Sequence, residues 1–182
     1  MSSQTLLVDS AAAKITVRTR AEGLLARFAH DLELTGREVS GNVTVDGDAW
    51  TANLSVPVAA LRVSGVLHGA EVDRSALSAS DRAQVEQKMR DDVFFGGARA
   101  VTAAAHGTSR TGGEATIAIG SRSQRAPVTL SVEAPFGGPT RATGRLTVSL
   151  AQLGVKPIKG PLGAFRVKDA IEILFDIPLS AS

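Results

Sequence analysis

The sequence contains no cysteine, and this absence removes several kinds of chemistry. Disulfides, thiolate zinc sites and a cysteine nucleophile are all excluded. Large aromatic residues are scarce, with six phenylalanines and one tryptophan among 182 residues. An excess of one charge is missing as well, because 20 basic groups nearly balance 18 acidic ones and leave a formal charge of +2. No strong electrostatic field results, so we do not expect nucleic acid as a partner.

The sequence predicts neither a leader nor a membrane span. Residues 1–9 have no basic region, and Asp9 interrupts their apolar stretch, so they do not resemble a secretory signal. No apolar run is long enough to cross a bilayer. We therefore expect a cytoplasmic protein, or a periplasmic one if a signal was removed from a longer chain.

The composition is that of a folded domain. Hydrophobic residues make up 43% of the chain and charged residues 21%, a balance typical of globular proteins. The length suits one domain, and neither long repeats nor linkers divide it. We predict a single domain over residues 1–182.

Alternation of apolar and polar residues dominates the chain and indicates half-buried β-strands. Between residues 24 and 34, one predicted strand face carries Leu24, Ala26, Phe28, His30, Leu32 and Leu34. The next predicted strand face carries Val39, Gly41, Val43 and Val45. Asp46-Gly47 then predicts a tight hairpin turn. The return strand presents Trp50, Ala52, Leu54 and Val56 and is expected to end at Pro57.

Further strands are predicted at residues 98–105, 115–119, 128–132, 142–150 and 167–177, with turns at Gly112-Gly113 and at residues 137–139. This makes eight or nine antiparallel strands with one apolar face. Such a set buries that face by closing into a barrel or by stacking on a second sheet. We predict an all-β fold in which the strands close into one barrel.

One segment departs from the β pattern. Ser80 is expected to cap a short amphipathic helix that begins at Asp81. Its apolar stripe and its expected ion pair consist of Val85, Met89 and Val93, and of Glu86 with Arg90. We expect this helix to cover an open end of the barrel.

Six segments, in this order and spacing, resemble the YceI-like family. They are LARFAHDL at 25–32, MRDDVFF at 89–95, GEATIAIG at 113–120, APVTL at 126–130, LGVKP at 153–157 and LGAFRVKD at 162–169. The resemblance spans nearly the whole chain and looks like a divergent branch. It implies a bacterial, lipocalin-like antiparallel barrel that binds long apolar lipids such as polyisoprenoids and isoprenoid quinones.

The predicted inward face mixes large and small side chains, which favours a cavity over a packed interior. Ala26, Gly41, Ala52, Ala103, Ala115 and Gly144 are expected to leave space. We predict ligand contacts from Ala26, Phe28, His30, Leu32, Trp50, Leu54, Ala103, Ile117, Leu130, Leu146, Phe165, Ile171, Ile173 and Phe175. The expected function is non-enzymatic binding, storage or transport of a long apolar ligand, an isoprenoid lipid or quinone. The alternative is a structural or stress-associated barrel with a packed interior that acts through a protein partner.

His30 is the one ionisable group predicted on the apolar face. It can hydrogen-bond a ligand head such as a quinone carbonyl, or a neighbouring protein group. A basic cluster near the last loop consists of Lys156, Lys159, Arg166 and Lys168. Its usual interpretation is a solvated loop, and the alternative is transient contact with a pyrophosphate or an anionic membrane.

Signatures of enzymes are weak. The three histidines form no HxxxH pair, and neither a nucleophile elbow nor a nucleotide-binding glycine pattern is present. We expect no catalytic residues, no metal and no cofactor. The sequence leaves the oligomeric state open, with a homodimer among the options.

Overall fold

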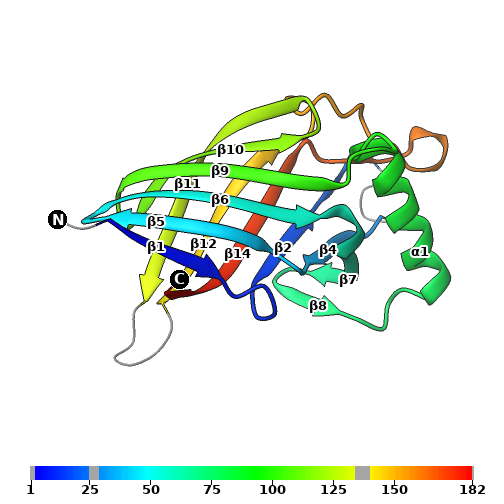
Figure 1. Ribbon diagram of the computed structural model, residues 1–182. Helices are drawn as coiled ribbons and strands as arrows, with labels where there is room; N and C mark the ends of the chain where they lie inside the picture. Colours follow the sequence, from blue (N-terminus) through cyan, green and yellow to red (C-terminus); the bar gives the residue numbers. More distant parts are fainter. Residues whose placement is uncertain (1–2, 25–28, 134–139, 182) are drawn as a thin grey trace.

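The computed structural model describes residues 3–24, 29–133 and 140–181, and these form an antiparallel β structure with a helix at one end (Figure 1). The strands are β1 (Gln4–Val8), β2 (Lys14–Thr19), β3 (Ala21–Glu22), β4 (Asp31–Gly36), β5 (Ser40–Asp46), β6 (Ala49–Pro57), β7 (Leu61–His68), β8 (Glu71–Asp73), β9 (Ala100–Ser109), β10 (Gly112–Ile119), β11 (Arg122–Glu133), β12 (Thr140–Ser149), β13 (Arg166–Val167) and β14 (Ala170–Ala181). The helical elements are α1 (Ala79–Lys88), the π-helical turn Met89–Val93 that follows it, and the 3-10 turns Val58–Ala60 and Pro161–Gly163.

The sheet closes on itself through β1. This strand pairs antiparallel with β5 on one side and with the end of β14 on the other. The circuit runs β1-β5-β6-β9-β10-β11-β12-β14 and makes a closed eight-stranded barrel. The predicted all-β, antiparallel barrel with one short helix is therefore confirmed.

The barrel wall divides toward its helical end. The first half of β14 pairs with β2, β2 pairs with β4, and β4 pairs with β7. Beyond β6 the chain continues as β7, which pairs with β8, whereas β9 pairs with β6. The wall is thus interrupted between β7 and β9. Helix α1 and its π-helical turn connect β8 to β9 and lie across this end of the barrel (Figure 1).

The helix begins two residues earlier than the sequence suggests. Ser78, not Ser80, is the cap: its hydroxyl accepts a hydrogen bond from the backbone N–H of Asp81 at 3.1 Å. The Asp81 carboxylate in turn accepts from the backbone N–H of Ser78 at 3.2 Å, which completes a capping box. The Ser78 hydroxyl and N–H hold the pKa of Asp81 below its ordinary value. This reciprocal pair outcompetes the single cap expected from Ser80.

Polar side chains of α1 fasten it to the open edge of β7. Arg82 donates from Nη1 to the carbonyl oxygens of Val63 and Ser64, each at 2.9 Å. Glu86 accepts from the backbone N–H of Val63 at 2.9 Å. The expected pairing of Glu86 with Arg90 is therefore wrong, because this carboxylate satisfies an exposed sheet edge instead.

The strand predicted from residue 24 is also wrong in its extent. Strand β4 begins only at Asp31, and Leu24 is 98% exposed. Gly23, with a φ of +112°, ends β3, and the Asp31 carboxylate accepts from the backbone N–H of Ala21 at 2.8 Å. This side-chain hydrogen bond is found at the segment where the sequence predicts backbone hydrogen bonds of a strand. The predicted positions Ala26 and Phe28 lie outside the described residues.

The remaining strands agree with the alternation, and their turns are displaced by a residue or two. Asp46 pairs with Ala49, so the β5–β6 turn consists of Gly47 and Asp48. The expected turn at Gly112-Gly113 lies instead at residues 110–111, and both glycines belong to β10. The turn predicted at residues 137–139 lies outside the described part of the chain. Within that part, no helix has the length and apolar character needed to cross a bilayer.

Candidate functional site

Two apolar cavities occupy the barrel interior, one toward each end. The turn-end chamber, about 330 Å³ in volume, lies near the β5–β6 and β9–β10 turns. The helix-end chamber, about 670 Å³, lies under α1. Both chambers are lined by the same five residues at their junction, Ile15, Val56, Val101, Ile117 and Ile173. The two cavities therefore lie next to one another along the barrel, with these five apolar side chains between them.

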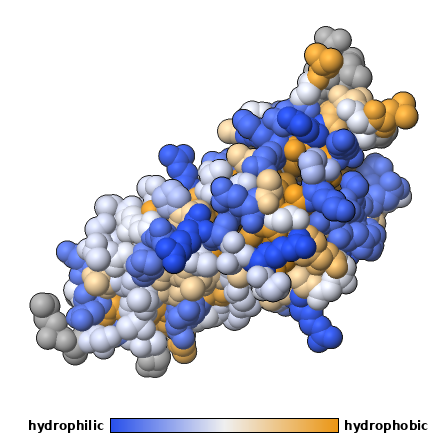
Figure 2. All heavy atoms as spheres, turned by 90° about the horizontal axis from the view of Figure 1, so that it is seen from above, coloured by the Kyte–Doolittle hydropathy of each residue, from blue (hydrophilic) through white to orange (hydrophobic). Residues whose placement is uncertain are grey.

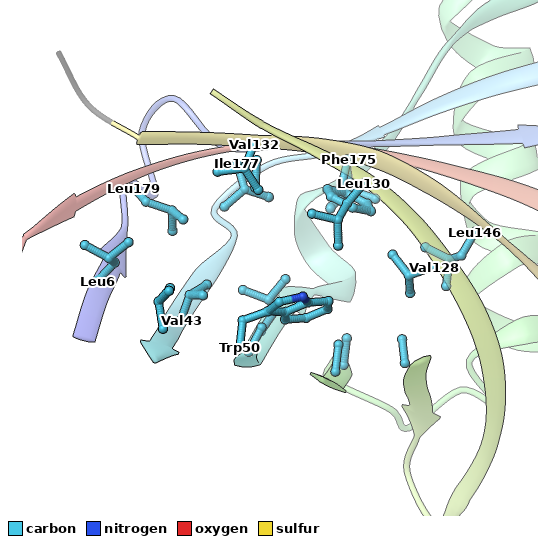
Figure 3. A pocket seen from close by; sticks show the side chains of 18 of the residues that line it. Leu6, Val43, Trp50, Val128, Leu130, Val132, Leu146, Phe175, Ile177 and Leu179 are labelled. Carbon is cyan, nitrogen blue, oxygen red and sulfur yellow. The ribbon is translucent and has the colours of Figure 1, made fainter. Parts of the chain in front are cut away.

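The turn-end chamber is walled by inward positions of all eight barrel strands. Figure 3 shows these side chains converging on the cavity: Leu6 from β1, Val43 from β5, Trp50 from β6, Val128, Leu130 and Val132 from β11, Leu146 from β12, and Phe175, Ile177 and Leu179 from β14. Ala103 and Ala105 of β9 and Ala115 of β10 complete the wall. Because alternate residues of a strand point the same way, the sequence pattern itself produces this wall.

Trp50 is held in place by its neighbours on β9 and β10. Its indole Nε1–H donates to the carbonyl oxygen of Ser109 at 2.8 Å. The ring lies against Gly107 and Gly113, where an added Cβ would come within 2.5 Å and 2.7 Å of indole atoms. These two glycines thus make room for the ring, and the only tryptophan of the chain has a fixed place in the chamber wall.

Five alanines, and not the glycines, keep the turn-end chamber open. They line it with short side chains and are Ala52, Ala103, Ala105, Ala115 and Ala142. A Cβ at Gly144 would lie 2.4 Å from the Phe175 ring, and one at Gly41 would lie 2.0 Å from a backbone oxygen of the next strand. The expectation that Gly41 and Gly144 leave cavity space is therefore wrong, because both positions are already filled by close contacts.

Polar residues gather where the turn-end chamber meets its mouth. Arg110 Nε lies 3.1 Å from the Asp48 carboxylate, and Nη2 donates to the carbonyl oxygen of Gly47 at 3.3 Å. Both Asp48 and Arg110 line the chamber. The contacts join the β5–β6 and β9–β10 turns, and the two charges neutralise one another. This mouth offers a ligand little net charge.

The helix-end chamber is built from segments far apart in the sequence. Its apolar walls are Leu32 and Leu34 of β4, Leu61 of β7, Val85, Met89, Val93 and Phe94 of the helical segment, Leu150, Leu153 and Ile158 after β12, and Phe165, Val167 and Ile171 before and within β14. The predicted stripe of Val85, Met89 and Val93 thus faces the barrel interior. The helix covers this end as expected and also supplies part of the chamber lining.

The rim of the helix-end chamber is basic. Arg20, His30, Lys88 and Lys159 line it, and none of the described residues that line it is acidic. Arg20 contacts Asp31 at 2.9 Å and Lys88 contacts Asp92 at 2.6 Å, while Lys159 forms no ion pair with any residue that the structure describes. Because the bare ammonium and the arginine side chain are hydrogen-bond donors, this rim suits a polar or anionic head group.

His30 lies on this rim and not inside the barrel. The sequence predicts it on a buried apolar strand face, but the residue precedes β4 and is exposed. The prediction fails because β4 begins at Asp31, the residue after His30. The imidazole nevertheless borders the helix-end chamber, where it can meet a ligand head.

The structure brings the described members of the predicted ligand set to the two chambers. Trp50, Leu54, Ala103, Leu130, Leu146 and Phe175 line the turn-end chamber, Ile117 and Ile173 line both, and His30, Leu32, Phe165 and Ile171 line the helix-end chamber. Ala26 and Phe28 lie outside the described residues. Sequence reasoning missed Leu6, Val101 and Ala105 as lining residues, although the same alternation contains them.

Titratable groups do not converge inside the described interior. No group of three or more histidine or acidic side chains among these residues has the spacing of a metal site. His68 ends β7 and His106 belongs to β9, and both are exposed. The resolved acidic pKa shifts belong to surface contacts, such as Asp169, whose pKa is held below its ordinary value by hydrogen bonds from the Ser149 hydroxyl and the Ala151 N–H.

Comparison with known proteins gives a fold relationship. No protein-family model and no curated protein matches the chain. The crystal structure of BcnA from Burkholderia cenocepacia is similar, with a TM-score of 0.67 over 96% of this chain and 99% of that chain, at 16% sequence identity. This similarity supports a lipocalin-like barrel.

Proposed function

We propose that this protein binds a long apolar molecule inside the barrel, an isoprenoid lipid or an isoprenoid quinone, and acts without catalysis as its carrier or buffer. The observation that carries the proposal is the succession of two apolar chambers along the barrel, which adjoin at five shared apolar residues. A round ligand needs one compact pocket, whereas two adjoining chambers suit an extended chain. The resemblance to the YceI-like family points to the same ligand class.

The length of the barrel suits such a tail. The twelve residues of β14 span about 40 Å at roughly 3.4 Å each. With the tilt of about 40° that an eight-stranded barrel needs, the wall is roughly 30 Å high. Apolar surface removed from water contributes about 25 cal/mol per Å², so the tail alone can supply useful affinity. Specificity then depends on tail length, tail width and the head group.

The rim of the helix-end chamber is the proposed place for the head group. His30 and the basic side chains there are hydrogen-bond donors, and the turn-end mouth has its two charges paired with each other. A quinone carbonyl or another polar head at the helix end would leave its tail directed along the barrel toward Trp50. The rival hypothesis of a protein-binding barrel requires a filled interior, and the two chambers count against it.

A series of prenyl quinones of increasing tail length tests this proposal. Trp50 lines the turn-end chamber, so its emission should change when a tail enters the barrel and packs beside the indole. At about 0.3 kcal/mol per atom, each five-carbon unit contributes about 1.5 kcal/mol, or roughly tenfold in affinity, until the chambers are full. Affinity that rises with tail length and then levels off is expected. Absence of binding at every length would overturn the proposal.

A further inference from the structure

A hairpin at the mouth of the helix-end chamber stands out from the rest of the surface. We call residues 156–168 the portal hairpin. The backbone N–H of Val167 donates to Ile158 at 2.9 Å, and that of Gly160 donates to Phe165 at 2.9 Å. These three apolar side chains face the helix-end chamber. One side of the hairpin is thus part of the cavity wall, and its tip extends beyond it.

The tip of the hairpin carries an exposed leucine. Leu162 is fully exposed and lies in a left-handed conformation, with a φ of 54° and a ψ of 15°. A residue with a Cβ is strained in the left-handed conformation, and the exposed leucine side chain buries no apolar surface that would offset this strain. An exposed apolar side chain held in an unfavourable backbone conformation indicates a role outside the folded chain.

A second exposed leucine emerges from the neighbouring segment. Strand β3 pairs with β13 of the portal hairpin, with Glu22 opposite Arg166. Gly23 follows, so close to the hairpin that an added Cβ would lie 3.5 Å from the Phe165 Cα. Leu24 comes next and is 98% exposed. Figure 2 shows hydrophobic residues projecting at the helical end of the molecule, among hydrophilic ones.

The charged residues of the portal hairpin itself are all basic. The portal hairpin contains Lys156, Lys159, Arg166 and Lys168 and no acidic residue, although the whole chain carries only +2. Arg166 pairs with Glu22 at 2.6 Å. The three lysines are exposed and form no ion pair with a described residue. A positive surface with apolar tips complements an anionic bilayer, whose phosphates attract the lysines while its interface accepts the leucines.

We infer that the portal hairpin and Leu24 dock the protein on anionic phospholipid membranes, with the mouth of the helix-end chamber against the bilayer. Leu162 and Leu24 enter the interface, and Lys156 and Lys168 contact the lipid phosphates. A lipid ligand would then pass between bilayer and barrel without crossing water. The docking itself depends only on the outer surface, and this route for the ligand rests on the proposed function.

Sedimentation with vesicles tests the docking. Wild-type protein should bind vesicles of phosphatidylcholine and phosphatidylglycerol in equal parts, bind those of phosphatidylcholine alone far more weakly, and dissociate as salt is raised. The double variants Leu24→Ser with Leu162→Ser, and Lys156→Glu with Lys168→Glu, should each lower partitioning about tenfold or more. Far-ultraviolet circular dichroism and thermal unfolding check that each variant is folded.

Matched controls change the same chemistry elsewhere. Leu7→Ser removes an exposed leucine from β1, and Arg125→Glu with Arg145→Glu reverses two charges on β11 and β12. These controls should keep nearly the whole of the wild-type binding. Absence of wild-type binding, or an equal loss in the controls, would overturn the inference. A loss in the lysine pair alone would also overturn it, because a purely electrostatic contact, for example with an acidic protein, needs no leucines.

A second measurement separates this inference from the proposed function. If both hold, the leucine variant should take up quinone slowly from anionic vesicles and bind detergent-dispersed quinone with wild-type affinity. Normal docking with no quinone bound in either form would contradict the proposed function alone. Normal quinone binding with uptake from vesicles that does not depend on the leucines would contradict the docking alone.

Discussion

Ala103 and Ala104 are neighbours on β9 whose side chains lie on opposite faces of the barrel wall. Ala103 lines the turn-end chamber, and Ala104 is exposed outside. Replacing each with phenylalanine adds the same ring inside and outside the cavity. The pair of variants therefore reports directly on whether the interior is empty.

The structure gives both the sign and the size of the effect. A phenyl ring needs on the order of 100 Å³, since cavities of about 150 Å³ hold benzene, and the turn-end chamber offers about 330 Å³. Filling empty space recovers about 24 cal/mol per Å³, or roughly 2 kcal/mol before side-chain entropy is subtracted. We expect Ala103→Phe to stabilise the ligand-free protein by about 1 kcal/mol. Displacing roughly six tail atoms should weaken quinone binding by about 2 kcal/mol, which is roughly 30-fold.

Urea unfolding of delipidated protein measures the first effect, and the change in Trp50 emission on titration with quinone measures the second. Ala104→Phe should leave quinone affinity unchanged and alter the free energy of unfolding by no more than about 0.5 kcal/mol. In a packed interior the inner ring would instead destabilise the protein by about 1–3 kcal/mol through overpacking. Such destabilisation, with quinone binding unaffected, would refute the reasoning.

Further predictions concern the elements that hold the chambers in shape. Arg82→Ala removes the hydrogen bonds from α1 to the edge of β7 and should cost about 1–3 kcal/mol in urea unfolding, whereas Arg82→Lys should recover part of it. Asp169 has a folded pKa below its unfolded value of about 3.9, so its contribution is full above that pH and is lost as pH falls through the folded pKa. Thermal unfolding of wild type and Asp169→Asn should therefore differ at neutral pH and converge below about pH 4; a constant difference would contradict this. Gly144→Ala places a Cβ 2.3 Å from the Thr129 carbonyl oxygen and 2.4 Å from the Phe175 ring, and should lower stability by about 1–3 kcal/mol in the same assay.

The alternation of side chains predicts most of the barrel because each strand must separate an apolar interior from water. The residues from Trp50 to Val56 show this well: their alternate members line the turn-end chamber as the sequence indicates. Closure through β1 and β14 joins the two ends of the chain, and no local pattern contains that pairing. The fold class was accessible from the sequence, but the strands β1, β2 and β7 and the division of the wall were not.

The alternation misleads where another interaction replaces the strand ladder. The apolar spacing that starts at Leu24 continues to Leu34, yet Gly23 turns the chain and the Asp31 carboxylate binds the backbone of Ala21. His30 consequently lies on the rim. Gly144 misleads for a different reason, since the space that it leaves is taken by Phe175 from the adjacent strand. The first error comes from a side-chain contact across ten residues, and the second from a contact between strands more distant in the sequence.

The rim and the portal hairpin were only partly visible from sequence. The basic cluster of residues 156–168 was evident, and a solvated loop was its usual interpretation. The pairing of β3 with β13 brings Leu24 beside this cluster, and the hairpin places it at a chamber mouth. The positions of Leu24 and of the chamber mouth beside the cluster follow only from the fold. Together they make the basic cluster a candidate membrane contact.

Native mass spectrometry of gently purified protein, combined with organic extraction, tests the central claim most directly. The account predicts an additional mass on the folded protein that is released on denaturation and is recovered as a long-chain isoprenoid lipid or quinone. Ala103→Phe should retain less of it than Ala104→Phe. Repeated absence of any bound lipid, together with no uptake of added quinone, would contradict the claim that the two chambers form a ligand site.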